Sequence, residues 1–215
     1  MSAEWIVIGG GGHGREVAAI IQDFLLKPGD RLLGFLDDNP YRVGTQLAGL
    51  PILGPGEWLA SFGGPLKVAL GLGASKAREA MVQRIRSFNV DVQFPLIQHP
   101  DALIGPRVTI GEGVLIQAGC VLTCDVEVGP FAVLNVGVSL SHDAKVGPFA
   151  TLAPGSRLAG GATVGFCAEV GMGTHVIQLR HIGDQTQTGA LAAVVRDLPD
   201  GITAVGVPAR ALQKR

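Results

Sequence analysis

The sequence is poor in the residues on which several common kinds of protein depend. Three of its 215 residues are cysteine, an odd number without a C-x-x-C pair, so neither a disulfide framework nor a zinc site is expected. Aromatic residues make up 5% and charged residues 16%, with 17 basic against 18 acidic side chains. Because no block of like charge stands out, neither nucleic acid nor an anionic membrane is expected as a partner.

Long hydrophobic runs are also missing. Glycine interrupts the apolar stretches before they reach the roughly 18 residues that a membrane span needs. The first residues do not form a basic segment followed by an apolar one, so we expect a cytoplasmic chain. Glycine itself is abundant, with 32 residues, about twice the usual share. Together with 47% hydrophobic residues, this predicts a folded chain with an aliphatic core.

Residues 1–98 have the pattern of an α/β domain. The apolar run 5–8 predicts a buried strand, a glycine-rich turn follows over 9–14, and apolar residues recur at helical spacing over 15–21. Further strands are expected at 32–36 and 67–70, and a helix at 75–88. This alternation predicts a small Rossmann-like parallel sheet.

Residues 99–215 are periodic instead. Steps of six residues from Ile104 to Val194 reach aliphatic residues at every position except Thr188, and small or β-branched residues follow four positions later. A six-residue period predicts a parallel β-helix. The segment 128–132 recurs at 146–150, which makes three hexads, or 18 residues, one coil with a short strand on each face. Glycines directly after the aliphatic positions, and Asn135 in the same place, are expected at corners with positive φ.

These features resemble a known family. The hexads and the ending AVGVPAR (204–210) resemble the left-handed β-helix acyltransferases. With the glycine turn and the segment 34–39, nearly the whole chain resembles the sialic acid O-acetyltransferase/bacillosamine N-acetyltransferase family, to which perosamine N-acetyltransferase is closely related. The resemblance implies a left-handed β-helix and a homotrimer that binds acetyl-CoA between adjacent subunits, without a metal. It also implies N-acetylation, at C4, of a UDP- or GDP-linked amino-dideoxy sugar for bacterial surface glycans such as O-antigen lipopolysaccharide.

The glycine turn has chemistry of its own. The pattern G-x-G-x-x-G over 9–14, between a strand and a helix, fits a dinucleotide fingerprint, whose backbone N–H groups hold a diphosphate. The residues alone leave open a nicotinamide-dependent oxidoreductase and a purely structural turn. His13 is equally compatible with a substrate contact and a helix cap. The resemblance favours a nucleotide-sugar site, for which we predict Gly11, Gly12, His13, Asp37, Asp38, Gly71, Gly73 and Asn135.

The resemblance also locates a catalytic centre. His142 stands with Asn135 and Asp143 in the family's pattern N-x(6)-H-[DE], and a neutral imidazole is suited to take a proton from an amine near pH 7. Asp143 would orient the ring. Gly160, one coil of 18 residues later, is expected to donate its N–H to the oxyanion. The contacts that the family implies for coenzyme A are Thr151, Met172, Gly189 and Ala190, although relatives have a glycine triplet where this chain has Gly-Ala-Leu.

Two further alternatives remain open at this stage. A sialic acid O-acetyltransferase would use the same scaffold, and a non-catalytic solenoid would bind no coenzyme A. His175 and His181, which share a hexad phase on neighbouring faces, could belong to a zinc site only with a third histidine from another subunit.

Overall fold

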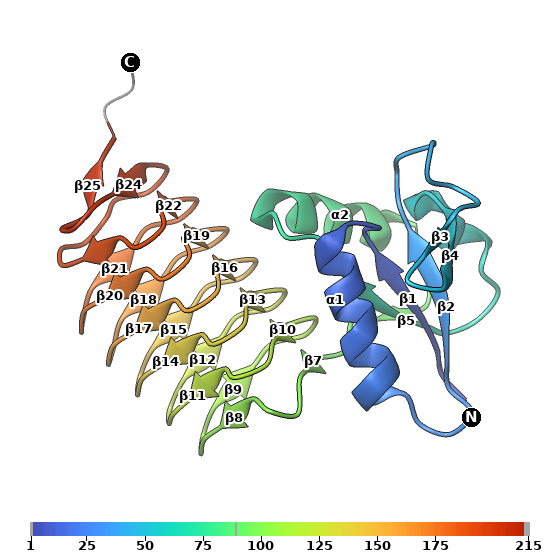
Figure 1. Ribbon diagram of the computed structural model, residues 1–215, viewed down its shortest axis with the longest axis horizontal. Coiled ribbons are helices and arrows are strands. Elements are labelled where there is room, and N and C mark those ends of the chain that lie inside the picture. The colour runs from blue at the N-terminus through green and yellow to red at the C-terminus, as the bar shows by residue number, and fades with distance from the viewer. Residues whose placement is uncertain (1, 89, 213–215) are drawn as a thin grey trace. The chain divides into compact units, whose positions relative to one another are not determined.

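The computed structural model describes residues 2–88 and 90–212, and its contacts divide the chain into two compact units (Figure 1). The first comprises Met1–Gly73 and Ala77–Ile97, and the second comprises Ala74–Lys76 and Gln98–Arg215. Within the described ranges, no helix combines the length and the apolar character that crossing a membrane requires.

The first unit contains a six-stranded sheet in the order β3-β4-β2-β1-β5-β6, parallel except for the edge strand β3. This confirms the predicted Rossmann-like sheet. The elements are β1 (Glu4–Ile8), α1 (Gly12–Ile20), the π-helical turn η1 (Ile21–Leu25), β2 (Arg31–Leu36), β3 (Gln46–Leu47), β4 (Leu50–Gly54), the 3-10 helix η2 (Gly56–Ser61), β5 (Leu66–Leu70), α2 (Ser75–Ser87) and β6 (Val92–Gln93).

The order of these strands creates a place for a ligand. From β1 the chain passes through α1 to β2 on one side and later continues to β5 on the other side of β1. Connections therefore diverge at the carboxyl end of β1, where open α/β sheets bind ligands. The hairpin β3–β4 was not predicted, and its turn at Ala48 and Gly49 has φ values of 50° and 78°. Such paired positive values match the right-handed twist of a two-residue hairpin.

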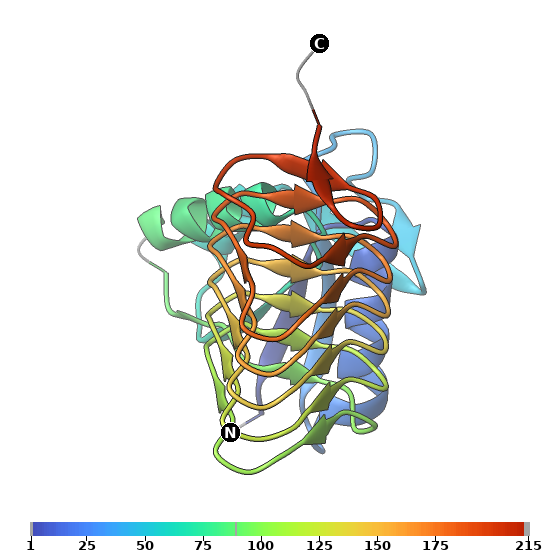
Figure 2. The same cartoon turned by 90° about the vertical axis from the view of Figure 1, so that its left-hand side faces the viewer.

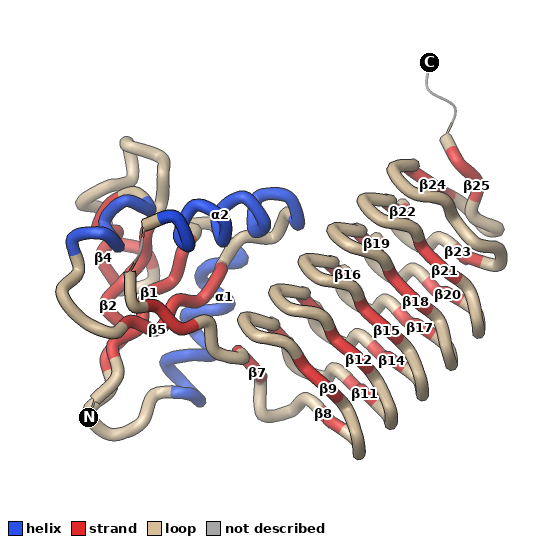
Figure 3. Tube along the Cα trace, turned by 180° about the vertical axis from the view of Figure 1, so that it is seen from behind, coloured by secondary structure: helices blue, strands red, loops and turns tan. Residues whose placement is uncertain are grey.

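The second unit is a parallel β-helix, as predicted, in which short strands stack in three sheets (Figures 2 and 3). Up to β22 and β23, each strand pairs with the strand 18 residues later, as Val133 does with Thr151, whereas β22 pairs with β24 only 16 residues later. Sheet I contains β7 (Ile97–Gln98), β10 (Leu115–Ile116), β13 (Val133–Leu134), β16 (Thr151–Leu152), β19 (Glu169–Val170), β22 (Gln187–Thr188), β24 (Thr203–Val205) and the antiparallel β25 (Arg210–Ala211).

The other two sheets complete the prism. Sheet II contains β8 (Leu103–Ile104), β11 (Val121–Leu122), β14 (Ser139–Leu140), β17 (Arg157–Leu158), β20 (His175–Val176) and β23 (Ala193–Val194). Sheet III contains β9 (Thr109–Ile110), β12 (Glu127–Val128), β15 (Lys145–Val146), β18 (Thr163–Val164) and β21 (His181–Ile182). We call the turn that follows a strand of sheet I, II or III corner I, II or III.

The interior of the β-helix is built from the two periodic series seen in the sequence. The last residue of a typical strand, such as Leu134 or Leu152, is fully buried, and so are the small residues four positions later, such as Val138 and Ser156. Stacking one aliphatic side chain on the next removes each from water, which stabilises a fold by about 1.5–3 kcal/mol per side chain. Each coil therefore depends on its neighbours for burial.

The predicted role of the corner glycines is wrong. From Arg107 through Leu191, positive φ, between 51° and 70°, falls on the third residue of each corner. The first residue of a corner, which includes Asn135 and the glycine column of corner III, does not have it. That column lacks side chains for another reason: a Cβ on Gly147 would lie 2.7 Å from the carbonyl carbon of Gly165 in the next coil. The column consists of Gly111, Gly129, Gly147, Gly165 and Gly183.

Candidate functional site

A histidine and an aspartate form a dyad at corner II of the β-helix. His142 and Asp143 follow β14, and Nδ1 of His142 lies 2.8 Å from Oδ2 of Asp143. Because an ionised carboxylate can only accept hydrogen bonds, Nδ1 is the donor in this pair, and in the neutral ring this leaves the lone pair on Nε2. Asp143 reaches this position with φ of 61°, as the third residue of its corner. The pair thus presents a basic nitrogen that is oriented for proton transfer.

Gly160 lies directly against the imidazole of His142. A Cβ added at Gly160 would come within 2.5 Å of Nε2, so this position has no room for a side chain. The carbonyl of His142 accepts a hydrogen bond of 2.9 Å from the N–H of Gly161, which fixes the two coils to each other. The N–H of Gly160 has no hydrogen-bond partner in the described part of the chain and stays available to a ligand. The coil arithmetic of the sequence therefore identified a true neighbour of His142.

The remaining predicted residues of the β-helix lie elsewhere in one chain. Asn135 is at corner I, before β14, and its Nδ2 donates a hydrogen bond of 2.9 Å to the carbonyl of Leu152. Thr151 is on sheet I, and Met172 occupies corner I, with 57% of its surface exposed. Gly189 and Ala190 are at the same corner, one coil after Met172. Sheet II lies between this group and His142.

Both side chains of the dyad are open to solvent. His142 and Asp143 are each 66% exposed. A catalytic dyad needs a second surface that excludes water and carries the reacting groups. Exposed apolar side chains flank the corners on either side of sheet II: Val136, Met172 and Leu191 at corner I, and Ile177 and Leu179 at corner II.

In the first unit, three glycines of the turn region serve close packing. Gly9 has φ of 106°, and a Cβ there would lie 2.7 Å from the carbonyl oxygen of Gly71. A Cβ on Gly14 would overlap the carbonyl oxygen of Gly9, and one on Gly71 would lie 2.5 Å from Cα of Gly14. The ends of β1 and β5 thus pack backbone to backbone against the start of α1. Gly71 was predicted as a ligand contact, and this packing is sufficient to explain why the residue there is glycine.

A pocket opens beside the same turn, at the switch point of the sheet. Its volume is about 290 Å³, and Gly10, Gly11 and Gly12 form one wall. A side chain on Gly11 would meet open space, as it would on Gly73. The pocket also contains Arg15 and Arg42, which the sequence analysis did not identify. Arg15 follows the glycine turn directly, which is a signal that could have been used, whereas Arg42 comes from a loop without one.

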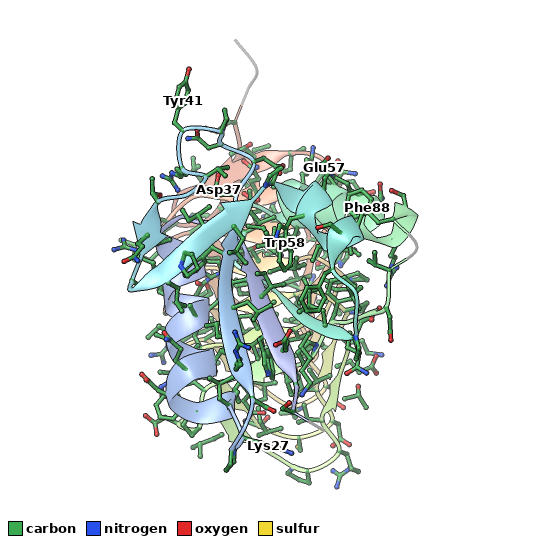
Figure 4. The ribbon with its side chains drawn as sticks, turned by 90° about the vertical axis from the view of Figure 1, so that its right-hand side faces the viewer. Lys27, Asp37, Tyr41, Glu57, Trp58 and Phe88 are labelled. Carbon is green, nitrogen blue, oxygen red and sulfur yellow. The ribbon has the colours of Figure 1, made fainter. Side chains whose placement is uncertain are left out.

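Asp37 forms hydrogen bonds with residues that line this pocket and with the loop beside it. Its Oδ2 accepts a hydrogen bond of 2.9 Å from the N–H of Gly10, and its Oδ1 accepts one of 2.9 Å from the N–H of Asn39. Arg42 donates from Nη1 to the carbonyl of Gly10, at 2.6 Å, and lies 3.3 Å from Oδ2 of Asp37. Figure 4 shows Asp37 and Tyr41 at the opposite end of the unit from Lys27. Asp37, which was predicted for the nucleotide-sugar site, is therefore engaged with the glycine turn and with the loop after β2.

Asp38 points into a different set of contacts. Oδ1 accepts a hydrogen bond of 3.0 Å from the N–H of Gly56, and Oδ2 forms an ion pair of 2.6 Å with Arg84 of α2. Arg84 also pairs with Glu57 of η2. Burial raises the pKa of Asp38, but the hydrogen bonds from Gly56 and Arg84 outweigh it, and the net pKa lies below its ordinary value. Asp38 links three elements and does not line the glycine pocket.

His13 lies inside the first turn of α1. The N-cap is Gly11, and no side chain caps the helix, so the predicted alternative of a helix cap is wrong. Nδ1 lies 3.1 Å from Oε2 of Glu16, whereas Nε2 is buried and finds no hydrogen-bond partner among residues 2–88 and 90–212. Burial lowers the pKa of His13, Glu16 raises it and Arg78 lowers it further, with a net decrease. His13 is therefore neutral near pH 7 and offers a ring nitrogen to a ligand.

The described residues offer no metal site. Across residues 2–88 and 90–212, no three His, Cys, Asp or Glu side chains are grouped so as to hold an ion. His175 lies on sheet II and His181 on sheet III, where Nδ1 of His181 is 2.7 Å from the hydroxyl of Thr163. The phase predicted for these two histidines is confirmed.

Comparisons with known proteins agree with this geometry. Residues 4–85 match the PglD N-terminal domain family. The structure is similar to the perosamine N-acetyltransferase of Caulobacter crescentus, solved with CoA and GDP-perosamine in a variant in which asparagine replaces a histidine. The two chains are 32% identical, with a TM-score of 0.88 over 99% of this chain and 98% of that one. A comparison with curated protein sequences found no match.

Two further solved structures are similar over nearly their whole length. The acetyltransferase domain of PglB from Neisseria gonorrhoeae FA1090 is 27% identical, with a TM-score of 0.89 over 98% of this chain and 100% of that one. WeeI from Acinetobacter baumannii AYE is 28% identical, with a TM-score of 0.87 over 98% and 100% of the two chains.

Proposed function

Because the chain belongs to the hexapeptide-repeat family of sugar N-acetyltransferases, we propose that it transfers an acetyl group from acetyl-CoA to the amino group, at C4, of a nucleotide-linked amino-dideoxy sugar. The observation that carries this proposal is the dyad of His142 and Asp143 against Gly160. An acyltransferase of this kind needs a base for the amine and a donor for the oxyanion, and corner II offers both within contact distance.

The reaction follows from these positions. The sugar nitrogen attacks the carbonyl carbon of the thioester, and Nε2 of His142 takes the proton that the amine loses. Asp143 stabilises the imidazolium through Nδ1. The free N–H of Gly160 donates to the oxyanion, an interaction typically worth about 3 kcal/mol. As the C–S bond breaks and the amide remains, the imidazolium returns its proton to the leaving thiolate.

The first unit is proposed to hold the nucleotide. Its pocket combines an open glycine turn with Arg15 and Arg42, and a diphosphate is matched by backbone N–H groups and guanidinium donors. Arg15 has no ion pair or side-chain hydrogen bond within the described residues, so its charge is available. His13 lies in the first turn of α1, directly after this glycine wall, and Gly73 stays a predicted contact. A nicotinamide cofactor is less well supported, because such a cofactor needs an acidic side chain for the hydroxyls of its ribose. Both carboxylate oxygens of Asp37 already accept hydrogen bonds from backbone N–H groups, those of Gly10 and Asn39.

Acetyl-CoA is proposed to bind between subunits of a homotrimer. The residues implied for coenzyme A, namely Thr151, Met172, Gly189 and Ala190, are on sheet I and corner I, whereas His142 is at corner II. A second copy that places its corner I against corner II would complete the site and cover the exposed dyad. The apolar side chains at both corners support this arrangement. The proposed compartment is the cytoplasm, and the proposed product is a precursor of bacterial surface glycans.

The test is an acetyltransfer assay on the full-length protein. The assay measures release of the coenzyme A thiol. Acetyl-CoA is the donor, GDP- or UDP-linked 4-amino-4,6-dideoxy sugars are the acceptors, and free sialic acid is the alternative acceptor. The similar protein from Caulobacter crescentus is an N-acetyltransferase, which favours an amine as the acceptor. His142→Ala should lower kcat by at least about 100-fold and leave the thermal unfolding temperature unchanged. The control is His181→Ala, on sheet III, which should retain activity; near-full activity of His142→Ala would refute the mechanism.

A further inference from the structure

One polar residue interrupts the aliphatic core of the β-helix near its C-terminal end. Thr188 of β22 (Figure 1) is the single position in the series of six-residue steps from Ile104 to Val194 that is not aliphatic. It is 6% exposed, and Thr174, at the corner I that follows β19, is fully buried beside it. Because a buried hydroxyl lowers stability unless it forms hydrogen bonds, two such residues in an aliphatic core indicate a specific role.

The two hydroxyls connect the backbones of two successive corners. The N–H of Gly171 donates to Oγ1 of Thr188 at 2.9 Å. Oγ1 of Thr174 donates to the carbonyl of Gly189 at 3.0 Å, and the two hydroxyl oxygens lie 3.1 Å apart. Since the single hydroxyl proton of Thr174 goes to Gly189, Thr188 is the donor between the hydroxyls. A directed chain of three hydrogen bonds therefore runs from corner I of one coil to corner I of the next.

This chain of hydrogen bonds replaces a backbone contact that the preceding coil makes. There, the N–H of Ala153 donates to the carbonyl of Val170 at 2.8 Å. Within the described residues, the N–H of Gly171 bonds to the hydroxyl of Thr188 and not to its carbonyl. β19 and β22 accordingly pair through one pair of residues, whereas β16 and β19 pair through two. A Cβ on Gly171 would overlap the Thr188 carbonyl oxygen, so corner I has a different shape here than at Ala153.

The residues beside this chain of hydrogen bonds are two of those implied for coenzyme A. Met172 follows Gly171 and Ala190 follows Gly189, so each stands next to one end of the chain. The carbonyl of Met172 accepts a hydrogen bond of 2.8 Å from the N–H of Leu191. The N–H groups of Met172 and Ala190 have no partner in the described part of the protein. An extended ligand with amide groups, such as the arm of coenzyme A, can accept from both only if their separation matches its own.

We propose that Thr174 and Thr188 are positioning residues for the acyl donor, because their hydroxyls set the separation and orientation of the backbone at Met172 and Ala190. The inference rests on the proposed function, which assigns coenzyme A to this corner. It does not depend on how subunits meet, since both side chains lie inside one β-helix. Without the Thr188 hydroxyl, the N–H of Gly171 would bond to the carbonyl of residue 188, and the corner would take the shape found in the preceding coil.

Calorimetric titration and steady-state kinetics of the full-length protein test this role. The probes are coenzyme A, GDP and UDP. The variants are Thr188→Val, which keeps the shape of the side chain, and Thr188→Ser, which keeps its hydroxyl. We expect Thr188→Val to raise the Kd of coenzyme A and the KM of acetyl-CoA by about tenfold, because a buried N–H loses its partner and the corner shifts. Thr188→Ser should retain most of the affinity, and kcat should change less than KM.

Binding of the nucleotides separates positioning from a general structural effect. The Kd of GDP or UDP should stay within about twofold of the wild-type value in Thr188→Val, because the nucleotide pocket shares no contact with this corner. An equal loss of affinity for the nucleotide and for coenzyme A would overturn the inference.

The matched control is Thr186→Val, which removes another fully buried hydroxyl, at the corner directly before β22. Oγ1 of Thr186 donates to the carbonyl of Pro199 at 2.6 Å. This variant should lower the unfolding temperature as Thr188→Val does, but leave the Kd of coenzyme A within about twofold of the wild-type value. Equal Kd values of coenzyme A for Thr188→Val and Thr186→Val would overturn the inference. A wild-type protein that does not bind coenzyme A would instead refute the proposed function, so the two failures are distinct.

Discussion

At corner II, the residue at position 160 determines how much room the ring of His142 has. The ring of His142 occupies the volume that any side chain at Gly160 would need. Its position is fixed on one side by Asp143 and on the other by a backbone that is free of side-chain atoms. The position of Nε2 therefore depends on residue 160 having no Cβ atom.

A methyl group at Gly160 should displace this imidazole. We expect Gly160→Ala to lower kcat by about 100-fold, because a misplacement of about 1 Å at a reacting group has effects of that size. The unfolding temperature should change little, since Gly160 does not have positive φ. The measurement is steady-state kinetics beside a thermal unfolding curve. Gly63→Ala, where a Cβ meets nothing within 4 Å, is the control; equal kcat for the two variants would contradict the contact.

At this scale, sequence reasoning succeeded where the coil register fixes position. His142 and Gly160 are 18 residues apart, and each coil has 18 residues, so their contact follows from arithmetic. Asp38 escaped the same reasoning because it lies in a loop, where its partners Gly56 and Arg84 are set by packing among β2, η2 and α2. Arg42 was missed for the same physical reason.

The glycine column of corner III is a feature of the whole β-helix element. Its members lack a Cβ because neighbouring coils approach there, while φ stays in the ordinary region. The sequence showed the 18-residue period of this column correctly. It did not show whether glycine is needed for a left-handed φ or for the close approach of the next coil, because both constraints select glycine.

These two constraints have separable costs. Gly147→Ala places a methyl group 2.7 Å from a backbone atom of the next coil and should lower the free energy of unfolding by about 3 kcal/mol. Gly155→Ala has φ of 69° and open space around the methyl group, and should cost about 1 kcal/mol. Urea unfolding midpoints of the two variants compare them directly. The opposite order would mean that backbone conformation, and not contact between coils, sets the requirement.

Arg84 joins α2 to the segment after β2 and to η2 through Asp38 and Glu57. Because the pKa of folded Asp38 lies below the unfolded value of about 3.9, its ionised form stabilises the fold above that value. This contribution is lost as the pH falls through the folded pKa. Half of the Asp38 side chain is exposed, so solvent screening limits the effect to about 1 kcal/mol.

The pH dependence of stability tests this link. Asp38→Asn should be less stable than the wild type at pH 7, and the two unfolding temperatures should converge as the pH falls below about 4 and the wild-type carboxylate is protonated. Asp23 of η1 has no hydrogen-bond or ion-pair partner for its side chain among the described residues, so Asp23→Asn is the matched control and should show no such convergence. A constant difference between Asp38→Asn and the wild type across this range would rule out the ion pair as its source.

For the whole molecule, the central question is how one active site draws on two corners. Within one chain, corner I and corner II are separated by sheet II, so we expect the proposed coenzyme A contacts and the dyad to meet across a subunit boundary. A trimer predicts a mass of 3 × 22.2 kDa in solution. Light scattering after size-exclusion chromatography measures that mass.

Mixing two inactive variants tests the shared site. His142→Ala removes the base, and Met172→Glu places a carboxylate at the proposed coenzyme A contact. In mixed trimers, a site is intact when its boundary takes Met172 from one variant and His142 from the other. With equal amounts of the two variants and random assembly, about a quarter of all sites are intact. Co-refolded mixtures should therefore recover activity that neither parent has. A mixture as inactive as its parents, with trimers confirmed, would place both groups in the same subunit.

The antiparallel turn of β25 onto β24 has a consequence for how copies of the protein meet. A stack of parallel coils ends in strand edges whose free N–H and C=O groups could pair with another copy, and repeated pairing of this kind produces fibres. At the edge of sheet I, the two-residue β25 reverses direction and carries Arg210. A short, charged and reversed edge does not match the parallel coils of another copy, so this sheet is protected against end-to-end polymerisation.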